Sequence, residues 1–201
     1  MRLSFIQFSL TFFLLLNSSE ILIAESPHEY VEKVHGEIVE VVKNKQKIFD
    51  DNPNEFILSI TEAIEPLVDY ERISRNVMGK FYKAASLNQR KKFQKIFKSS
   101  LLNTYSKTLA EFQNEEIIVL PKVKKSNRPN REKVHLEIKT NTKNYPAVYD
   151  MYLNERGDWK IINIVINGVN LGLVFRNQFY SLMEIHDNEI DTVINNWISS
   201  I

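Results

Sequence analysis

The spacing of the apolar residues changes twice along the chain, and this change limits the possible folds more than any other feature. Up to about residue 113, apolar side chains recur every three or four positions, which is typical of amphipathic helices. From residue 116 to residue 167 they mostly alternate with polar side chains, which is typical of strands. Helical spacing returns after Gly168. This order predicts an α+β fold in which helices wrap a curved antiparallel sheet of four to five strands.

The helices of the first half begin with recognisable signals. The segments 26–29, 52–55 and 86–89 each place Ser or Asn at the N-cap and Glu or Gln three residues later. A further short helix is expected to end at Gly79, because glycine favours helix C-caps. The last of these helices, at about 87–113, would be roughly 40 Å long. One of its sides forms an aromatic-rich wall made of Phe93, Ile96, Phe97, Leu101, Tyr105, Leu109 and Phe112.

Strands are predicted in the second half. They cover residues 116–120, 134–139, 147–154 and 159–167, and they are expected to pair as an antiparallel meander. The last of them carries apolar residues on both faces, so both faces are expected to be covered. Two final helices are expected, one through residues 173–182 and one at 188–201.

Residues 1–24 differ from the rest of the chain. Arg2 precedes an apolar stretch at 3–16, and polar residues follow it. At about 21 Å as a helix, this stretch is too short for a hydrocarbon core of roughly 30 Å. We therefore predict a signal peptide at 1–24, with Ala24 as the cleavage residue, followed by a single domain at 25–201. An uncleaved membrane anchor is the alternative.

The composition excludes several classes of protein. The chain has no cysteine, which excludes disulfides and thiolate metal sites. Its 26 basic and 25 acidic residues give a net charge of +1, so we predict no nucleic-acid partner. Glycine-rich phosphate-binding motifs do not occur in the sequence. A basic run at 122–133 fits either a solvated loop or docking to an acidic partner surface.

No catalytic or metal site stands out. Two histidines and a glutamate share a helix face at 28–35 with metal-ligand spacing, but exposed helix positions explain them more simply. Asp150 with Tyr149 or Tyr152 could serve an isomerase-like enzyme. Strand alternation opposes this, because Asp150 and Tyr149 would point to opposite faces. We predict no enzyme, no catalytic residue, no metal and no cofactor.

Two segments of the chain together resemble one known family. The first is DYERISRNVMGKFYKAAS at 69–86, and the second comprises GDWKI at 157–161, INGVNL at 166–171 and FRNQF at 175–179. They are similar to the central helices, last strand and following helix of the MlaC family of toluene-tolerance and phospholipid-transport auxiliary proteins. The resemblance implies a nuclear-transport-factor-like (cystatin-like) cone with extra helices, located in the periplasm. Phe81 stands where tryptophan is common in that family, and the site stays apolar.

The same resemblance implies a periplasmic phospholipid carrier that holds acyl tails in an apolar cavity and helps to maintain outer-membrane lipid asymmetry. Its partners would be an outer-membrane lipoprotein complex and an inner-membrane ABC transporter with an MCE-domain subunit. It would dock to them transiently as a monomer. The alternatives are an isomerase-like enzyme of the same cone fold and a periplasmic interaction module that binds no lipid.

A lipid carrier must replace the hydrocarbon that its ligand leaves. At about 0.8 kcal/mol per methylene, exposing about 30 methylenes would cost roughly 24 kcal/mol, so the cavity must be apolar and nearly dry. We expect the tails to lie between the long helix wall and the last strands, with further apolar residues at the mouth. The predicted lining comprises Met78, Phe81, Phe93, Phe97, Leu101, Tyr105, Leu109, Met151, Trp159, Ile161, Ile164, Ile166, Val169, Leu171, Val174, Phe175 and Phe179. Ordinary core packing is the alternative for each of them.

Overall fold

The computed structural model describes residues 25–110, 116–122 and 126–198. The helices are α1 (Pro27–Asp51), α2 (Pro53–Ile64), α3 (Tyr70–Met78), the short 3-10 helix η1 (Gly79–Tyr82), α4 (Leu87–Ala110), α5 (Leu171–Ile185) and α6 (Ile190–Asn195). The strands are β1 (Glu116–Val119), β2 (Arg131–Lys139), β3 (Asn144–Leu153), β4 (Trp159–Ile166) and β5 (Val169–Asn170). The predicted signal peptide at 1–24 and the wall residue Phe112 lie outside the described residues.

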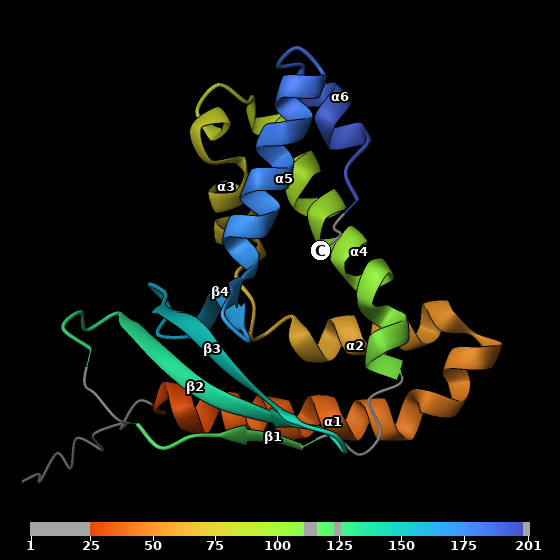
Figure 1. Ribbon diagram of the computed structural model, residues 1–201, viewed down its shortest axis with the longest axis vertical. Coiled ribbons are helices and arrows are strands. Elements are labelled where there is room, and N and C mark those ends of the chain that lie inside the picture. The colour runs from red at the N-terminus through yellow and green to blue at the C-terminus, as the bar shows by residue number, and fades with distance from the viewer. Residues whose placement is uncertain (1–24, 111–115, 123–125, 199–201) are drawn as a thin grey trace, which may run out of the picture.

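The five strands form one antiparallel sheet in the order β1-β2-β3-β4-β5 (Figure 1). Val134 of β2 lies opposite Tyr149 of β3, and Tyr149 lies opposite Ile164 of β4. The register between β3 and β4 shifts after Asp150, which leaves Ile162 out of the pairing. The predicted curved antiparallel meander, and with it the α+β fold class, is confirmed.

The predicted helix starts are also confirmed. The Oγ atoms of Ser26 and Ser86 each accept a hydrogen bond from the backbone N–H three residues later. In return, the side chains of Glu29 and Gln89 accept from the backbone N–H of the capping serine. Helix α3 ends at Gly79, whose φ of +50° is unfavourable for residues with a side chain.

Two expectations for the last part of the chain are wrong. Asn167 and Gly168 both have positive φ angles, 49° and 81°, which suit a two-residue type I′ hairpin turn. This turn returns the chain as the short strand β5, whereas the sequence predicted that the chain would leave the sheet at Gly168. The final helix ends at Asn195 instead of continuing. The chain then turns so that Trp197 packs against buried phenylalanine rings.

The buried apolar residues divide the molecule into two main regions (Figure 1). Helix α1 lies along the sheet, and α3 to α6 stand together beyond the β4 end of the sheet. The helical cluster comprises the buried residues Val77, Met78, Ala85, Phe93, Phe97, Phe175, Phe179, Met183, Val193, Ile194 and Trp197. The sheet cluster comprises the buried residues Val31, Val34, Leu67, Val134, Leu136, Ala147, Met151 and Ile161. A small third cluster, made of Val42, Phe56 and Ile60, joins α1 to α2.

Candidate functional site

Five aromatic rings meet in the helical cluster. Phe93 and Phe97 come from α4, Phe175 and Phe179 from α5, and Trp197 from the residues after α6. The ring centroid of Phe93 lies 5.0 Å from that of Phe179 and 5.2 Å from that of Trp197, both in edge-to-face contact. Phe93 and Phe97 are completely buried. The first part of the predicted helix wall therefore packs against protein side chains.

Trp197 is the member of this group that sequence reasoning missed. It is 4% exposed and contacts Phe93, Phe97 and Phe179. A signal was present, because Val193 and Ile194 precede it at spacings of four and three, which place all three on one side of a helix.

The sheet cluster forms where α1 covers one face of the sheet. Val31 and Val34 of α1 share it with strand residues such as Leu136 and Met151. Trp159, Ile164 and Ile166 lie at its edge and are only partly buried. The apolar face of the strands is therefore already in contact with a helix, and that helix is α1.

The structure distributes the predicted lining residues over both clusters. The helical cluster and its edge contain Met78, Phe81, Phe93, Phe97, Leu101, Leu171, Phe175 and Phe179. The sheet cluster and its edge contain Met151, Trp159, Ile161, Ile164 and Ile166. Val174 and Tyr105 are partly buried, and the enclosed Tyr105 hydroxyl has no hydrogen-bond partner among the residues that the structure describes. Val169 is 45% exposed in β5, and the side chain of Leu109 lies outside the described part.

Backbone and side-chain hydrogen bonds tie the two clusters together. The N–H of Ile161 in β4 donates to the carbonyl of Leu67, and the N–H of Asp69 donates back to the carbonyl of Ile161. At the start of α5, the N–H of Gly172 donates to Asn163 Oδ1 of β4 over 3.1 Å. The helical cluster is thus attached to the sheet along β4.

A neutral polar pair lies beside the sheet cluster. His35 of α1 is 7% exposed, and its Nε2 atom lies 3.1 Å from the hydroxyl of Tyr149. Burial lowers the pKa of His35 to about 4 and raises the pKa of Tyr149 above its ordinary value. Both groups are therefore uncharged at neutral pH. This pair adds hydrogen-bonding capacity to the interior without adding charge.

The isomerase-like pairing of Asp150 with Tyr149 is opposed by the strand geometry, as predicted. Tyr149 points to α1, where it meets His35, whereas the carboxylate of Asp150 binds Lys133 on the opposite face. Within the described residues, no three His, Asp or Glu side chains come together as a group that could hold a metal ion. In the same residues, no helix has the length and apolar content needed to cross a membrane.

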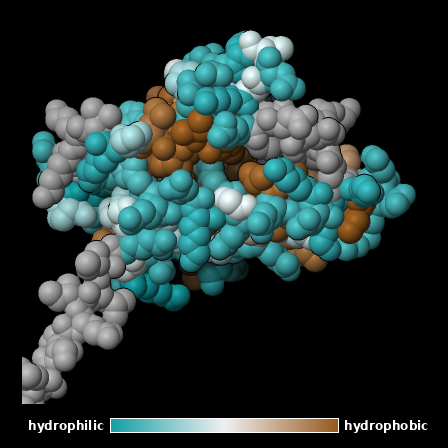
Figure 2. Space-filling view, turned by 90° about the horizontal axis from the view of Figure 1, so that it is seen from below, coloured by the Kyte–Doolittle hydropathy of each residue, from teal (hydrophilic) through white to brown (hydrophobic). Residues whose placement is uncertain are grey.

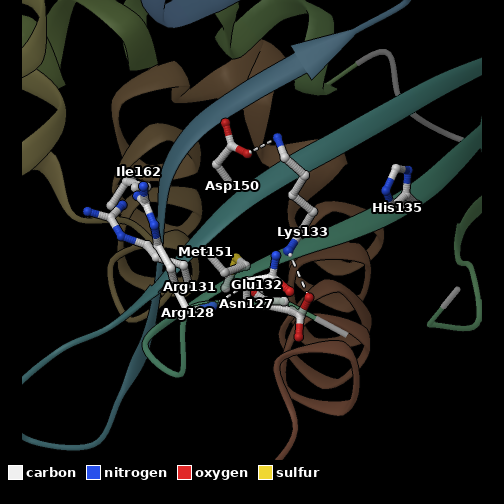
Figure 3. Close-up of a pocket in the computed structure, with 10 residues that line it drawn as sticks. Asn127, Arg128, Arg131, Glu132, Lys133, His135, Asp150, Met151 and Ile162 are labelled. Atoms are coloured by element: carbon white, nitrogen blue, oxygen red, sulfur yellow. Dashed lines mark hydrogen bonds and ion pairs between the residues drawn. The ribbon is translucent and has the colours of Figure 1, made fainter. Parts of the chain in front are cut away.

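A pocket of about 810 Å³ lies on the sheet face opposite α1 (Figure 3). Eight of its ten lining residues carry polar or charged side chains, although carbon atoms make up most of its surface, and Met151 is the member of the predicted lining that it contains. Its lining comprises Ser126, Asn127, Arg128, Arg131, Glu132, Lys133, His135, Asp150, Met151 and Ile162. Elsewhere some apolar residues reach the surface, and Figure 2 shows a hydrophobic patch near the middle of an otherwise mainly hydrophilic face.

Comparison with known proteins identifies the family. The model of the MlaC protein family matches residues 32–199. The toluene tolerance protein Ttg2D of Pseudomonas putida is 32% identical over 180 residues, which cover 89% of this chain and 82% of that protein. The chain belongs to the MlaC family. The resemblance predicted from the two sequence segments is confirmed.

One further relative and one solved structure extend this result. The intermembrane phospholipid transport system binding protein MlaC of Haemophilus influenzae is 25% identical over 172 residues, which cover 82% of this chain and 77% of that protein. A phospholipid-binding protein from Ralstonia solanacearum, solved in complex with a phospholipid, has a TM-score of 0.75 at 20% identity. That comparison covers 84% of this chain and 95% of the other, and it shows that the two chains share a fold.

The two segments that carry the MlaC resemblance lie against each other in the structure. Arg176 Nε of α5 donates to the carbonyl of Asn76 in α3 over 2.8 Å. The hydroxyl of Tyr180 accepts from the N–H of Lys80 over 2.9 Å. A Cβ atom added at Gly79 would lie 2.2 Å from the same hydroxyl, so a side chain at this position would displace Tyr180. The MlaC-like residues thus build the contact between α3 and α5.

Proposed function

We propose that residues 25–201 form a single periplasmic domain that binds a phospholipid by its acyl tails and carries it between membranes without changing it chemically. The observation that carries this proposal is membership of the MlaC family over residues 32–199. Relatives support it, because one is named as an intermembrane phospholipid transport binding protein and another was solved with a phospholipid. Residues 1–24 would be the signal peptide that directs export.

The half-buried members of the predicted lining are the ones most able to contact a lipid. Leu101, Leu171, Ile164 and Ile166 each keep some exposed surface beside a cluster of buried apolar residues. Phe93, by contrast, is already enclosed by other rings and would have to leave them to reach a ligand. We infer that the tails enter between the helical cluster and the sheet cluster, where the half-buried residues gain burial.

The energetic requirement favours this location. Moving about 30 methylenes into water would cost roughly 24 kcal/mol, so the tails must exchange bilayer for apolar protein surface. Both clusters supply such surface, and the His35–Tyr149 pair beside the sheet cluster is neutral. Met78 and Met151, one in each cluster, have flexible side chains that suit tails of different length.

The proposal also includes a route of transport. The carrier would receive lipid at one membrane complex and release it at another, through an outer-membrane lipoprotein complex and an inner-membrane ABC transporter with an MCE-domain subunit. It would do so as a monomer that docks transiently and would maintain outer-membrane lipid asymmetry.

Lipid extraction tests the proposal directly. The mature protein would be purified, extracted with organic solvent and examined by mass spectrometry. A carrier yields about one phospholipid per protein or more, whereas an isomerase-like enzyme or a purely structural interaction module yields none. Absence of phospholipid from folded protein would contradict the proposal.

Two substitutions test the location of the tails. Leu101→Glu and Ile164→Glu place a charge where acyl chains are expected and should abolish the extracted lipid, because an unpaired charge in hydrocarbon is strongly unfavourable. Leu58→Glu is the matched control, since Leu58 is 57% exposed on α2 and should keep wild-type lipid content. Unchanged lipid in the first two variants would remove those side chains from the site.

A further inference from the structure

The pocket on the sheet face opposite α1 is lined by three side chains with a full positive charge, Arg128, Arg131 and Lys133, against two carboxylates. Arg131, Lys133 and His135 of β2 alternate with Val134 and Leu136, which belong to the sheet cluster, so the two sets point to opposite faces. The connection at residues 126–128 closes one side of the pocket. Figure 3 shows Arg128 and Arg131 together on one side, with Lys133 and Asp150 paired on another.

The negative charges in this pocket already have partners. Glu132 forms an ion pair with Lys122. One carboxylate oxygen of Asp150 accepts from Lys133 Nζ over 2.6 Å, and the other accepts from Asn163 Nδ2 over 3.0 Å. The charge of Glu132 is therefore balanced by Lys122, and the charge of Asp150 by Lys133.

Two arginine charges remain uncompensated. Among the residues that the structure describes, neither Arg128 nor Arg131 forms an ion pair with a carboxylate. The guanidinium of Arg131 instead lies 4.7 Å from the ring centroid of Tyr152, on which Arg72 also stacks at 3.9 Å. An aromatic ring orients Arg131 but leaves its charge and most of its donors available.

Backbone hydrogen bonds hold the two arginines at the same end of β2. The N–H of Arg131 donates to the carbonyl of Arg128, which closes a turn. The N–H of Arg128 donates to Ser126 Oγ over 3.1 Å, and the N–H of Leu153 donates to the carbonyl of Asn130. A turn fixed in this way reduces the ordering that a ligand would have to impose.

We propose that this pocket binds a phosphoryl group through Arg128 and Arg131. A guanidinium matches phosphate with two parallel donors, and two uncompensated guanidiniums match its charge. A volume of about 810 Å³ exceeds that of inorganic phosphate alone and admits an organic phosphate ester. The phosphoryl group has two possible sources, a phospholipid headgroup or a free phosphate compound. The headgroup source rests on the proposed lipid-carrier function, whereas the free phosphate source does not.

Calorimetric titration of the mature protein tests the proposal. Inorganic phosphate and glycerophosphoethanolamine, a water-soluble headgroup, would be added separately at low ionic strength. Saturable binding is expected, and the double variant R128Q/R131Q should bind about tenfold more weakly or worse, because it loses charge-assisted hydrogen bonds. Tighter binding of glycerophosphoethanolamine assigns the pocket to a lipid headgroup, and binding of phosphate alone assigns it to a free phosphate compound.

Matched variants separate a specific site from general positive charge. R75Q/R156Q removes two exposed arginines outside the pocket and should bind like the wild type. R128K/R131K keeps both charges and should fold even if the glutamine variant does not. It should bind more weakly than the wild type, because lysine lacks the planar donor pair.

Three outcomes would overturn the proposal: no saturable binding of either probe, an equal loss in R75Q/R156Q, or wild-type affinity in R128K/R131K. Extraction of lipid from the same variants keeps the two proposals apart. A variant that loses phosphate binding but keeps its phospholipid supports the pocket as a site of its own. Failure to find lipid in any variant would contradict the carrier function and leave the phosphate result standing.

Discussion

The helical cluster and the sheet cluster bury their apolar residues in different ways. In the helical cluster, rings from α4 and α5 and the ring of Trp197 enclose one another, and Phe93, Phe97 and Phe179 are fully buried. The sheet cluster is mainly aliphatic, has half-buried strand residues at its edge and lies beside the polar His35–Tyr149 pair. We therefore expect the helical cluster to contribute more stability, and the sheet cluster to change more readily when a ligand binds.

The two tryptophans make this comparison measurable. Trp197 belongs to the helical cluster, and Trp159 lies at the edge of the sheet cluster. The chain has no others. W159F and W197F therefore give single-tryptophan proteins whose fluorescence reports on one region each. Coincident urea transitions in the two proteins would show that both regions unfold as a unit.

The largest effect is expected from Phe179→Ala. Phe179 is completely buried and contacts Phe81, Phe93 and Trp197. Removing its ring should lower the free energy of unfolding by about 3–5 kcal/mol, as measured by urea denaturation. Leu173→Ala in the same helix is the control, because Leu173 is 48% exposed and should change stability by less than about 0.5 kcal/mol. Similar losses in both variants would contradict the tight packing of the helical cluster.

The next effect is a pH dependence that belongs to the sheet region. Burial lowers the pKa of folded His35 from 6.5 to about 4, so the unfolded chain binds more protons in this interval. The free energy of unfolding should therefore decrease as the pH falls from about 6.5 to about 4, by up to about 3 kcal/mol from this group. The contribution is fully present above pH 6.5.

Urea denaturation across this pH range checks the histidine assignment. His35→Gln removes the titrating group, so its stability should depend less steeply on pH than that of the wild type. His135→Gln serves as the control because His135 is exposed on the other face of the sheet, and its slope should match the wild type. Equal slopes in the His35 variant and the wild type would exclude His35 as the source.

A smaller effect is expected where the two regions join. Asn163→Ala removes the acceptor for the Gly172 N–H and one donor to Asp150, which should cost about 1–2 kcal/mol. Amide exchange at Gly172 should become faster. Asn177→Ala is the control, because Asn177 is exposed in the middle of α5 and should change stability by less than about 0.5 kcal/mol. Unchanged exchange at Gly172 would show that this hydrogen bond does not hold α5 to β4.

Local signals explain why most of the fold was predictable. A capping serine and its glutamate or glutamine lie within four residues, and strand alternation is visible within one strand, so neither depends on distant parts of the chain. The short strand β5 was missed because the Asn167–Gly168 pair was interpreted as the end of the sheet and not as a hairpin turn. The positive φ angles of Asn167 and Gly168, rather than any apolar spacing, turn the chain back to pair as β5.

The candidate site was less predictable because its composition depends on distant contacts. Periodicity correctly placed Phe93 and Phe97 on a buried side of their helix. It does not indicate whether the opposite surface is a ligand or another ring, and here that surface includes Trp197 from the last part of the chain. The spacing of residues in the sequence did not predict the pocket that we propose as a phosphoryl-binding site either. Its basic run was visible, but the pairing of Lys133 with Asp150 required the β2–β3 register.

The smallest effects are expected from the serines that cap the first turns of α4 and α1, one helix from each region. Ser86→Ala removes the cap of α4 and should cost about 1 kcal/mol, and Ser26→Ala should do the same for α1. Ser→Gly at either position should cost only a few tenths of a kcal/mol, since glycine is tolerated at N-caps. If the regions unfold as one unit, each alanine variant shifts the urea transitions of Trp159 and Trp197 equally. A shift of Trp197 alone by Ser86→Ala, or of Trp159 alone by Ser26→Ala, would show that the helical and sheet regions unfold separately.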